Sequence, residues 1–367
     1  MSNLLCCSIW NKRFNAILKW NAFKFSVFLL ISVVVTVVIL SRNHARNIEA
    51  DFSSSYLFSS SSPANESPLC SGNLLDKRQI RYAKEGGGSC QLLHYNFERA
   101  VGCFDALYER HYSDWNSPHI LNHINGPNRK LHFAFIGDSR IRQQFFNFLK
   151  LIPDYDWESQ PNPLPSGHHG DMEVTSDIIR LRLSFQWRPI LNDTVIETIR
   201  QWATASATYR PNFIVIGITV WHMLHSEGAD FKLYKEKLKE LAPFLGQLAN
   251  VSRVIWLNQY PVIEKYGYSG AMNTDIFSEK IHRYNKAVTS ALQQNYSGMR
   301  MIWDSSNILV EEYIRGCFLY VRRQRESHSF SDPDHSYINC LDFTHPGYSA
   351  LSQAAQLLFN DICNEFY

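Results

Sequence analysis

Two short motifs far apart in the chain contain the residue types needed for nucleophilic catalysis. The first is Gly137-Asp138-Ser139, and the second is Asp342-Phe343-Thr344-His345. A serine hydroxyl is a weak nucleophile at neutral pH and needs a base to accept its proton. His345 has the side chain for that task. Asp342, in the same loop, has the carboxylate that would hold the imidazole tautomer and stabilise the imidazolium. Together the motifs predict covalent acyl chemistry.

The elements expected around Ser139 favour this interpretation. Residues 131–137 (LHFAFIG) form an apolar run of strand length, and a helical pattern follows at once. Ser139 would then lie at the carboxyl end of a buried strand and at a helix N-terminus. Unpaired N–H groups and the positive end of the helix dipole stabilise an oxyanion there, and Gly137 permits the tight turn. The alternative is that Ser139 only caps the helix.

Apolar runs and amphipathic helices alternate along the rest of the chain. Runs at 178–185, 213–217, 253–257 and, more weakly, 299–303 predict strands, the first of them alternating as near a sheet edge. Apolar stripes at 231–245 and 348–362 predict helices, with Pro346 in the first turn of the second. We therefore predict an α/β fold, a three-layer α/β/α sandwich with a mainly parallel sheet. Its active site would lie at the carboxyl ends of the strands.

Composition excludes several classes of protein. The chain has 367 residues, of which 45% are hydrophobic, 14% aromatic and 19% charged, with a net charge of +2. Such a chain has enough apolar material to fold, so a disordered tail is excluded. A mean hydropathy of −0.25 excludes a polytopic membrane protein, and the low net charge argues against nucleic acid as a partner.

The N-terminal sequence predicts a membrane anchor. Residues 1–24 contain four basic residues and no acidic one, and residues 25–40 are uncharged and mostly apolar. This pattern predicts a cytoplasmic tail (1–24) and a transmembrane signal anchor (25–40) of a single-pass type II protein. A Ser-rich stem (41–69) and a lumenal catalytic domain (70–367) would follow. The alternative is a cleaved signal peptide.

The cysteines fit an oxidising compartment. Six follow the stem, namely Cys70, Cys90, Cys103, Cys317, Cys340 and Cys363. An even number predicts up to three disulfides, whose connectivity the spacings do not fix. The spacings match no zinc pattern, and the pairs His168/His169 and His222/His225 lack a third ligand. We predict no metal site.

The arrangement of the motifs resembles a known superfamily. A Gly-Asp-Ser after the first strand and an Asp-x-x-His before the last helix are similar to the SGNH (GDSL-like) esterases and acyltransferases. The resemblance is narrower at GDSRIRQQFFNF (137–148), SFQWRP (184–189), GITVW (217–221) and KIHRYNKAV (280–288). These segments resemble the lumenal domain of the animal sialate O-acetyltransferases, the CAS1-domain family related to PC-esterases, from about Cys70 to the C-terminus.

The resemblance implies an activity and a location. Ser139 would be the nucleophile, His345 the general base and Asp342 its orienter. The expected reaction moves acetyl from acetyl-CoA, through an acetyl-serine, to a sialic acid hydroxyl on a glycan, at the Golgi membrane. No bound cofactor is expected. Animal members continue into a multi-span membrane domain, and because this sequence stops at Tyr367, a separate multi-span donor protein is a possible partner. The alternatives are an O-acetylesterase with the same triad and a non-catalytic glycan-binding accessory protein.

One position departs from the superfamily pattern. Typical members have a Gly-x-Asn-Asp block whose Asn completes the oxyanion hole. The corresponding strand end reads Gly217-Ile-Thr-Val-Trp221-His222. Thr219 or a backbone N–H near Gly217 is our candidate for the missing donor.

Four further residues are candidate substrate contacts. Arg140 and Arg142 follow Ser139 on the expected helix, and a guanidinium binds a carboxylate bidentately, which would suit an acidic sugar. The alternative is an ion pair within the protein. Trp187 and Trp221 are candidate platforms for a sugar ring, with core packing as the alternative.

Overall fold

The computed structural model describes ten segments of the chain, all within the unit Ser67–Tyr367. They are residues 92–113, 129–165, 167–206, 209–224, 227, 230–262, 276, 278–293, 302–326 and 344–364. The predicted tail, anchor and stem lie outside the described residues. Within the described segments, no helix has both the length and the apolar character needed to cross a membrane.

A seven-stranded sheet forms the middle layer, with the strand order β2-β3-β4-β1-β5-β6-β7. The strands are β1 (Leu131–Gly137), β2 (Glu158–Gln160), β3 (Met172–Ser176), β4 (Leu181–Trp187), β5 (Phe213–Gly217), β6 (Arg253–Leu257) and β7 (Ile302–Trp303). Strands β4, β1, β5, β6 and β7 run parallel, whereas β2 and β3 pair antiparallel at one edge. The prediction of an α/β fold with a mainly parallel sheet is confirmed.

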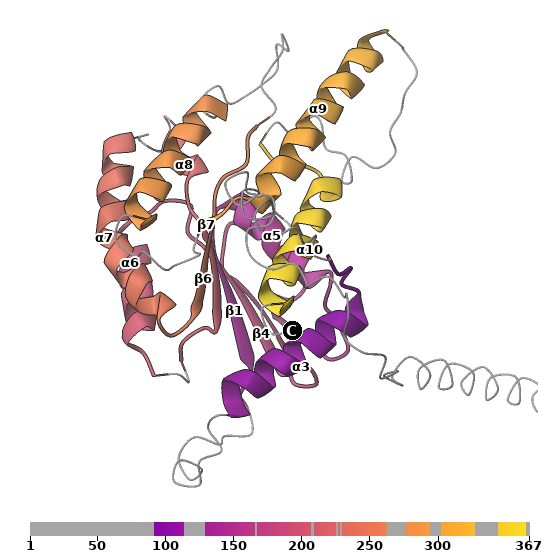
Figure 1. Ribbon diagram of the computed structural model, residues 1–367, viewed down its shortest axis with the longest axis vertical. Helices are drawn as coiled ribbons and strands as arrows, with labels where there is room; N and C mark the ends of the chain where they lie inside the picture. The colour runs from indigo at the N-terminus through magenta and orange to yellow at the C-terminus, as the bar shows by residue number, and fades with distance from the viewer. Residues whose placement is uncertain are drawn as a thin grey trace, which may run out of the picture. The chain divides into compact units, whose positions relative to one another are not determined.

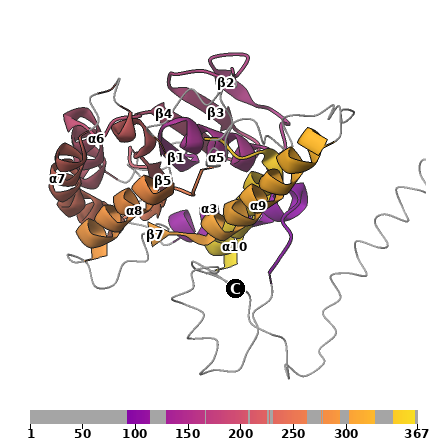
Figure 2. The ribbon, with the colours of Figure 1, turned by 90° about the horizontal axis from the view of Figure 1, so that it is seen from above.

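Helices cover both faces of the sheet. They are α3 (Phe97–Ser113), α5 (Ser139–Leu149), α6 (Asp193–Thr204), α7 (Phe231–Ala249), α8 (Ser278–Gln293), α9 (Ser305–Glu326) and α10 (Tyr348–Asn364), with a short 3₁₀ turn, η1, at Val220–Met223. Helices α6, α7 and α8 lie on one side, and α3, α5 and α10 on the other, with α9 beside α10 (Figures 1 and 2). The layers are therefore helix, sheet and helix. Pro346 precedes α10 by two residues instead of lying in its first turn.

Each face of the sheet has its own hydrophobic core, and β1 contributes to both. Phe133 and Phe135 belong to the core under α3, α5 and α10, whereas Ala134 and Ile136 belong to the core under α6, α7 and α8. A central strand covered on both faces needs apolar residues at every position, which explains its continuous apolar run. The first core is rich in phenylalanine, and the rings of Phe148 and Phe359 stack at 4.5 Å.

The strand order reverses beside β1. The helix that follows β1 packs on one face of the sheet, and α7, which follows the neighbouring β5, packs on the opposite face. In open α/β sheets, ligands bind at the carboxyl ends of the strands where the strand order reverses. The carboxyl ends of β1 and β5 form such a point, and Gly137 pairs with Gly217 there.

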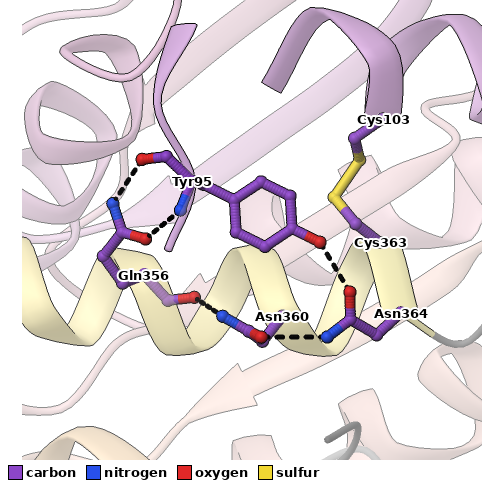
Figure 3. Close-up of a disulfide and its surroundings, with 6 residues drawn as sticks. All are labelled: Tyr95, Cys103, Gln356, Asn360, Cys363 and Asn364. Carbon is purple, nitrogen blue, oxygen red and sulfur yellow. Dashed lines mark hydrogen bonds between the residues drawn. A yellow bond between two sulfur atoms is a disulfide. The ribbon is translucent and has the colours of Figure 1, made fainter. Parts of the chain in front are cut away.

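A polar and covalent clamp joins the first and last described helices (Figure 3). Cys103 of α3 and Cys363 of α10 form a disulfide across 260 positions of sequence. Beside it, the amide of Gln356 exchanges two hydrogen bonds with the backbone of Tyr95, at 2.7 Å each, and the Tyr95 hydroxyl donates to Asn364. One predicted disulfide thus has a defined pairing. Cys317 is also disulfide-bonded.

Candidate active site

Ser139 and His345 meet at the carboxyl edge of the sheet. The Oγ of Ser139 lies 2.6 Å from the Nε2 of His345, although 206 positions separate them in the chain. Ser139 is the first residue of α5, and His345 precedes α10. Both side chains are half-buried. The distance is that of a short hydrogen bond, so a proton can pass directly between the two atoms.

The junction of β1 and α5 is built to present Ser139. Asp138 is the N-cap of α5, and its Oδ1 accepts a hydrogen bond of 2.9 Å from the N–H of Arg140. Its Oδ2 accepts a longer one, 3.4 Å, from the N–H of Val220, the first residue of η1. This carboxyl is fully buried, and burial raises its pKa against the opposing effects of Arg140 and the two N–H groups. Asp138 therefore ties the turn that carries Ser139 to η1, which follows the neighbouring strand β5.

Close packing of α5 on the sheet depends on two strand-ending glycines. A Cβ added to Gly137 would stand 2.3 Å from the carbonyl oxygen of Gly217 and 2.5 Å from Cγ1 of Ile141. A Cβ added to Gly217 would stand 2.5 Å from Cδ1 of Ile141. None of these distances is compatible with van der Waals contact. The role of Gly217 visible in the structure is this close approach of the helix.

Arg140 lies inside the protein and supports the loop that holds His345. Its side chain is 1% exposed. The Nε group donates to the carbonyl oxygen of Thr344 at 3.1 Å, and one terminal nitrogen donates to the carbonyl of Tyr260 at 2.7 Å. The guanidinium also lies 4.1 Å from the centre of the Tyr260 ring. Of the two hypotheses for Arg140, the geometry favours contacts within the protein over contact with substrate.

The sequence motifs did not reveal the residues that hold Arg140. Gln259 accepts from Arg140 through Oε1 at 3.2 Å. Its backbone is fixed in turn by the side-chain amides of Asn285 and Asn307, since Asn285 bonds both its N–H and its carbonyl. The only signal in the sequence was position, because Gln259 follows the predicted strand at 253–257.

Arg142 lies one helical turn beyond Ser139, beside an aromatic cluster. Its guanidinium donates to the carbonyl of His168 at 2.6 Å and lies 5.6 Å from the Trp187 ring centre. The cluster consists of Trp187, His169 and Trp221. Trp187 stacks on His169 at 4.4 Å and meets Trp221 edge-on at 5.7 Å. Both tryptophans are half-buried at the carboxyl edge. The structure thus brings together three of the four candidate substrate residues, namely Arg142, Trp187 and Trp221.

The side chain of Thr219, our candidate oxyanion donor, is hydrogen-bonded to Tyr234 inside the protein. Its side chain is fully buried, and Oγ1 lies 3.0 Å from the hydroxyl of Tyr234 on α7. The N–H of Val220 is bonded to Asp138. By contrast, no group in the described part of the chain accepts a hydrogen bond from the backbone N–H of Ser139, the first amide of α5. Helices leave such N–H groups without partners in the helix itself.

The remaining candidates are placed as follows. His222 is buried, and its Nε2 accepts from the N–H of Leu191 at 2.7 Å, which gives it a structural role. Burial lowers its pKa to about 4. His225 and Asp342 lie outside the described residues. Within the described segments, no three His, Cys, Asp or Glu side chains gather as metal ligands do.

A comparison with known proteins found a relative of this chain. The chain is 27% identical, over 239 residues, to a Danio rerio protein named N-acetylneuraminate (7)9-O-acetyltransferase. This chain is similar to a sialate O-acetyltransferase. The match covers 65% of the chain but only 26% of the relative. It supports the resemblance to the CAS1-domain family. No family model matches the chain.

Proposed function

We propose that this protein is a serine-dependent O-acetyltransferase that moves an acetyl group to a hydroxyl of a glycan, with sialic acid as the acceptor sugar. The observation that carries the proposal is the 2.6 Å contact between Ser139 Oγ and His345 Nε2 at a helix N-terminus. The similarity to a protein named as a sialate O-acetyltransferase supports the acyl group and the acceptor.

The first half-reaction forms an acetyl-serine. As Oγ of Ser139 bonds to the carbonyl carbon of an acetyl thioester, its proton moves to Nε2 of His345. The tetrahedral intermediate then collapses, the carbon–sulfur bond breaks, and His345 returns the proton to the departing thiolate. We take acetyl-CoA as the donor, a substrate and not a resident cofactor. Nucleophilic catalysis of this kind divides one difficult transfer into two easier ones.

The second half-reaction transfers the acetyl group to the sugar. A sugar hydroxyl gives its proton to His345 while its oxygen attacks the acetyl-serine carbonyl. The bond to Oγ breaks, and Ser139 regains the proton from His345. Excluding water at this stage separates a transferase from an esterase.

The charge that develops on the carbonyl oxygen needs hydrogen-bond donors. We assign the N–H of Ser139 as one donor, because it lies at the positive end of α5 and has no acceptor in the described part of the chain. Asp342 remains our candidate for orienting His345, on the strength of the Asp-x-x-His spacing.

The acceptor sugar is placed against the aromatic cluster. In this proposal, Trp187 and Trp221 contact the apolar face of the ring, and Arg142 binds the carboxylate of sialic acid. The pairing of Trp187 with Gly137 in the sheet register supports this placement, because Ser139 follows Gly137 by two residues.

The proposal includes a location and a donor route, both on sequence grounds. Residues 25–40 would anchor the protein in the Golgi membrane, with the catalytic domain in the lumen. Acetyl groups would come from acetyl-CoA directly or through a separate multi-span protein.

The test is an acetyl-transfer assay with the full chain in detergent. The purified protein is incubated with acetyl-CoA and a sialylated acceptor, and acetylated sugar and free acetate are measured by mass spectrometry. We expect acetylated product with wild type and with the control Ser352→Ala, an exposed serine of α10, and none with Ser139→Ala. Trapping of an acetyl group on Ser139 would show the intermediate directly.

Other results would point to the alternatives. Acetate released only from an acetylated sugar would identify an esterase. Glycan binding that is the same in wild type and Ser139→Ala, with no product in either assay, would rule out the enzyme and favour an accessory protein.

A further inference from the structure

A polar groove lies on the open face of β4 and β3, and Ser139 does not line it. Its volume is about 420 Å³. Its floor includes His132 of β1 with Ser184 and Gln186 of β4, and its walls include Asp171, Trp202 and Tyr209. The catalytic proposal uses none of these side chains.

The groove exists because the helical layer does not cover the whole sheet. On the side of α6, α7 and α8, the hydrophobic core takes residues from β1, β5 and β6 but none from β4 or β3. The residues of β4 that face this side are Arg182, Ser184 and Gln186, whereas Leu181, Leu183 and Phe185 face the opposite core. This is the alternation of a strand with one covered face and one open face.

Polar groups in the groove are fixed by bonds to one another. His132 is 9% exposed, and its Nε2 lies 2.8 Å from Oγ of Ser184. At the other end, Oε1 of Gln186 is buried and has no hydrogen-bond partner in the described part of the chain. Buried acceptors are nearly always bonded, so an unpaired one suggests a missing partner. The terminal torsion of glutamine is soft, which lets the amide turn toward a hydroxyl placed in the groove.

The charges of the groove cancel. Arg182 donates through Nε and a terminal nitrogen to Glu173, at 3.0 and 2.6 Å. Asp171 accepts from two nitrogens of Arg188, at 2.7 and 3.0 Å. A polyanion binds where positive charges are in excess, and the groove has no excess of positive charge. Its chemistry suits an uncharged molecule with many hydroxyl groups.

Two aromatic side chains complete the fit to a sugar. Tyr209 is 78% exposed, and Trp202 of α6 is half-buried at the groove wall. A pyranose ring has an apolar face of C–H groups and a rim of hydroxyls. An exposed ring such as tyrosine contacts the first, and planar amides, carboxylates and guanidinium groups bond the second.

The groove lies close to the proposed active site. Asp171 lines the groove, and its Oδ1 also accepts from the N–H of Trp187, a member of the aromatic cluster. Gln186 pairs in register with Ile136, three residues before Ser139. From a strand spacing of about 4.8 Å and a rise of about 3.3 Å per residue, Gln186 and Ser139 are roughly 11 Å apart. A short oligosaccharide spans such a distance.

We propose that this groove binds the neutral sugars that precede the acceptor residue in a glycan chain, so that the protein recognises an oligosaccharide and not a single sugar. The inference rests on the proposed function for the acceptor end of the chain. The groove itself is an independent glycan site, and its occupancy does not require acetyl transfer.

The kinetic test compares a short and a long acceptor. Acetylation of free N-acetylneuraminic acid and of sialyllactose is measured for wild type, Tyr209→Ala and the control Tyr155→Ala, another exposed tyrosine that does not line the groove. We expect Tyr209→Ala to raise KM for sialyllactose about tenfold, which corresponds to about 1.4 kcal/mol. KM for the free sugar and kcat for both acceptors stay unchanged. Equal KM effects on both acceptors, or none, would overturn the proposal.

A binding arm separates this inference from the proposed function. Sialyllactose and lactose are titrated into the Ser139→Ala protein, with and without Tyr209→Ala, and followed by NMR. We expect both sugars to bind, weakly dependent on salt, and Tyr209→Ala to weaken both about tenfold. If no acetyl transfer occurs but these sugars bind through Tyr209, the groove stands and the catalytic proposal fails. Absence of binding, or an affinity that falls steeply with salt, would overturn the groove.

Discussion

Ser139 and His345 belong to separate elements, and Arg140 joins those elements from inside the protein. The backbone of α5 carries both Ser139 and Arg140, and the guanidinium of Arg140 holds the carbonyl of Thr344, the residue before His345. The helix that presents the proposed nucleophile therefore also fixes the loop that presents the proposed base. A small displacement of that loop would lengthen the 2.6 Å contact through which the proton passes in this proposal.

Arg140→Lys tests this positioning role. Lysine keeps the charge but cannot bond Thr344, Gln259 and Tyr260 at once, because its three donors share one atom. We expect kcat for acetyl transfer to fall at least about tenfold with KM for the acceptor nearly unchanged. Arg142→Lys gives the matched contrast, since a residue that binds the sugar carboxylate should mainly raise KM. A KM effect from Arg140→Lys and none on kcat would contradict the assignment.

At the residue scale, the sequence predicts which side chains could do chemistry better than it predicts which side chains are buried. The Gly-Asp-Ser and Asp-x-x-His patterns predict that Ser139 and His345 act together, and the structure places their side chains 2.6 Å apart, because residue types at strand ends are visible in the sequence. Whether an arginine faces substrate or protein depends on distant residues. Gln259 lies 119 positions from Arg140, and no local pattern connects them.

The junction of β1 with α5 depends on how closely helix and sheet approach. At Gly217 an added methyl group would strike only the side chain of Ile141 and the end of Gln259, whereas at Gly137 it would also strike the backbone oxygen of Gly217. A side chain can be shortened, but a strand carbonyl cannot move without loss of its sheet pairing.

Gly137→Ala and Gly217→Ala should therefore differ in whether they can be rescued. We expect each to lower the free energy of unfolding by about 1–3 kcal/mol. Adding Ile141→Val, which removes the nearest atom, should recover part of the loss for Gly217→Ala but not for Gly137→Ala. Urea denaturation of the four variants and of Ile141→Val alone gives the two coupling energies. Equal coupling at both glycines would argue against the geometry.

The disulfide between α3 and α10 is the second test at the level of elements. It closes a loop across 260 positions, and cross-links of long loops restrict the unfolded chain most. We expect Cys103→Ser to lower the free energy of unfolding by about 2–5 kcal/mol. Cys363→Ser and the double variant should lose the same amount, because all three remove one bond. Losses that add in the double variant would contradict the pairing.

The elements that the sequence predicts well are those buried on both faces. Strands β1, β5 and β6 have the predicted bounds, since covered strands are apolar throughout. In the run at 178–185, β4 begins only at Leu181, because Arg180 takes a positive φ of 54° and ends a turn. We predicted neither β2 nor β3: the edge strand β2 has three residues and no buried one, and β3, between β2 and β4, alternates buried and half-buried residues over only five positions.

We expect the stability of the whole folded molecule to fall in acid because of two buried histidines. Burial lowers the pKa of His132 to about 3 and that of His222 to about 4, against an ordinary value of 6.5. Above pH 6.5 both are neutral whether the chain is folded or not. Below it, the unfolded chain binds protons that the folded chain does not, so stability falls as pH falls, down to the folded pKa values.

His222→Gln isolates one of these contributions. Glutamine can still accept from the N–H of Leu191 but does not titrate. Between pH 6 and about 4, wild type should lose stability relative to the variant by up to about 1.4 kcal/mol per pH unit. His282→Gln, at an exposed position of α8, should follow wild type. Denaturation at several pH values decides, and parallel curves for wild type and His222→Gln would refute the prediction.

The link between α3 and α10 also decides when, during synthesis, the protein can finish folding. The phenylalanine-rich core takes residues from both helices, and Cys363 is synthesised 260 residues after Cys103. A ribosome adds residues at about 5–20 per second, so roughly 13–50 seconds pass before Cys363 is synthesised. During that time Cys103 cannot form its native disulfide and one face of the sheet lacks its last helix. The domain must therefore complete its fold after Cys363 has been made, and a nascent chain held short of that residue should bind chaperones and react with thiol reagents at Cys103.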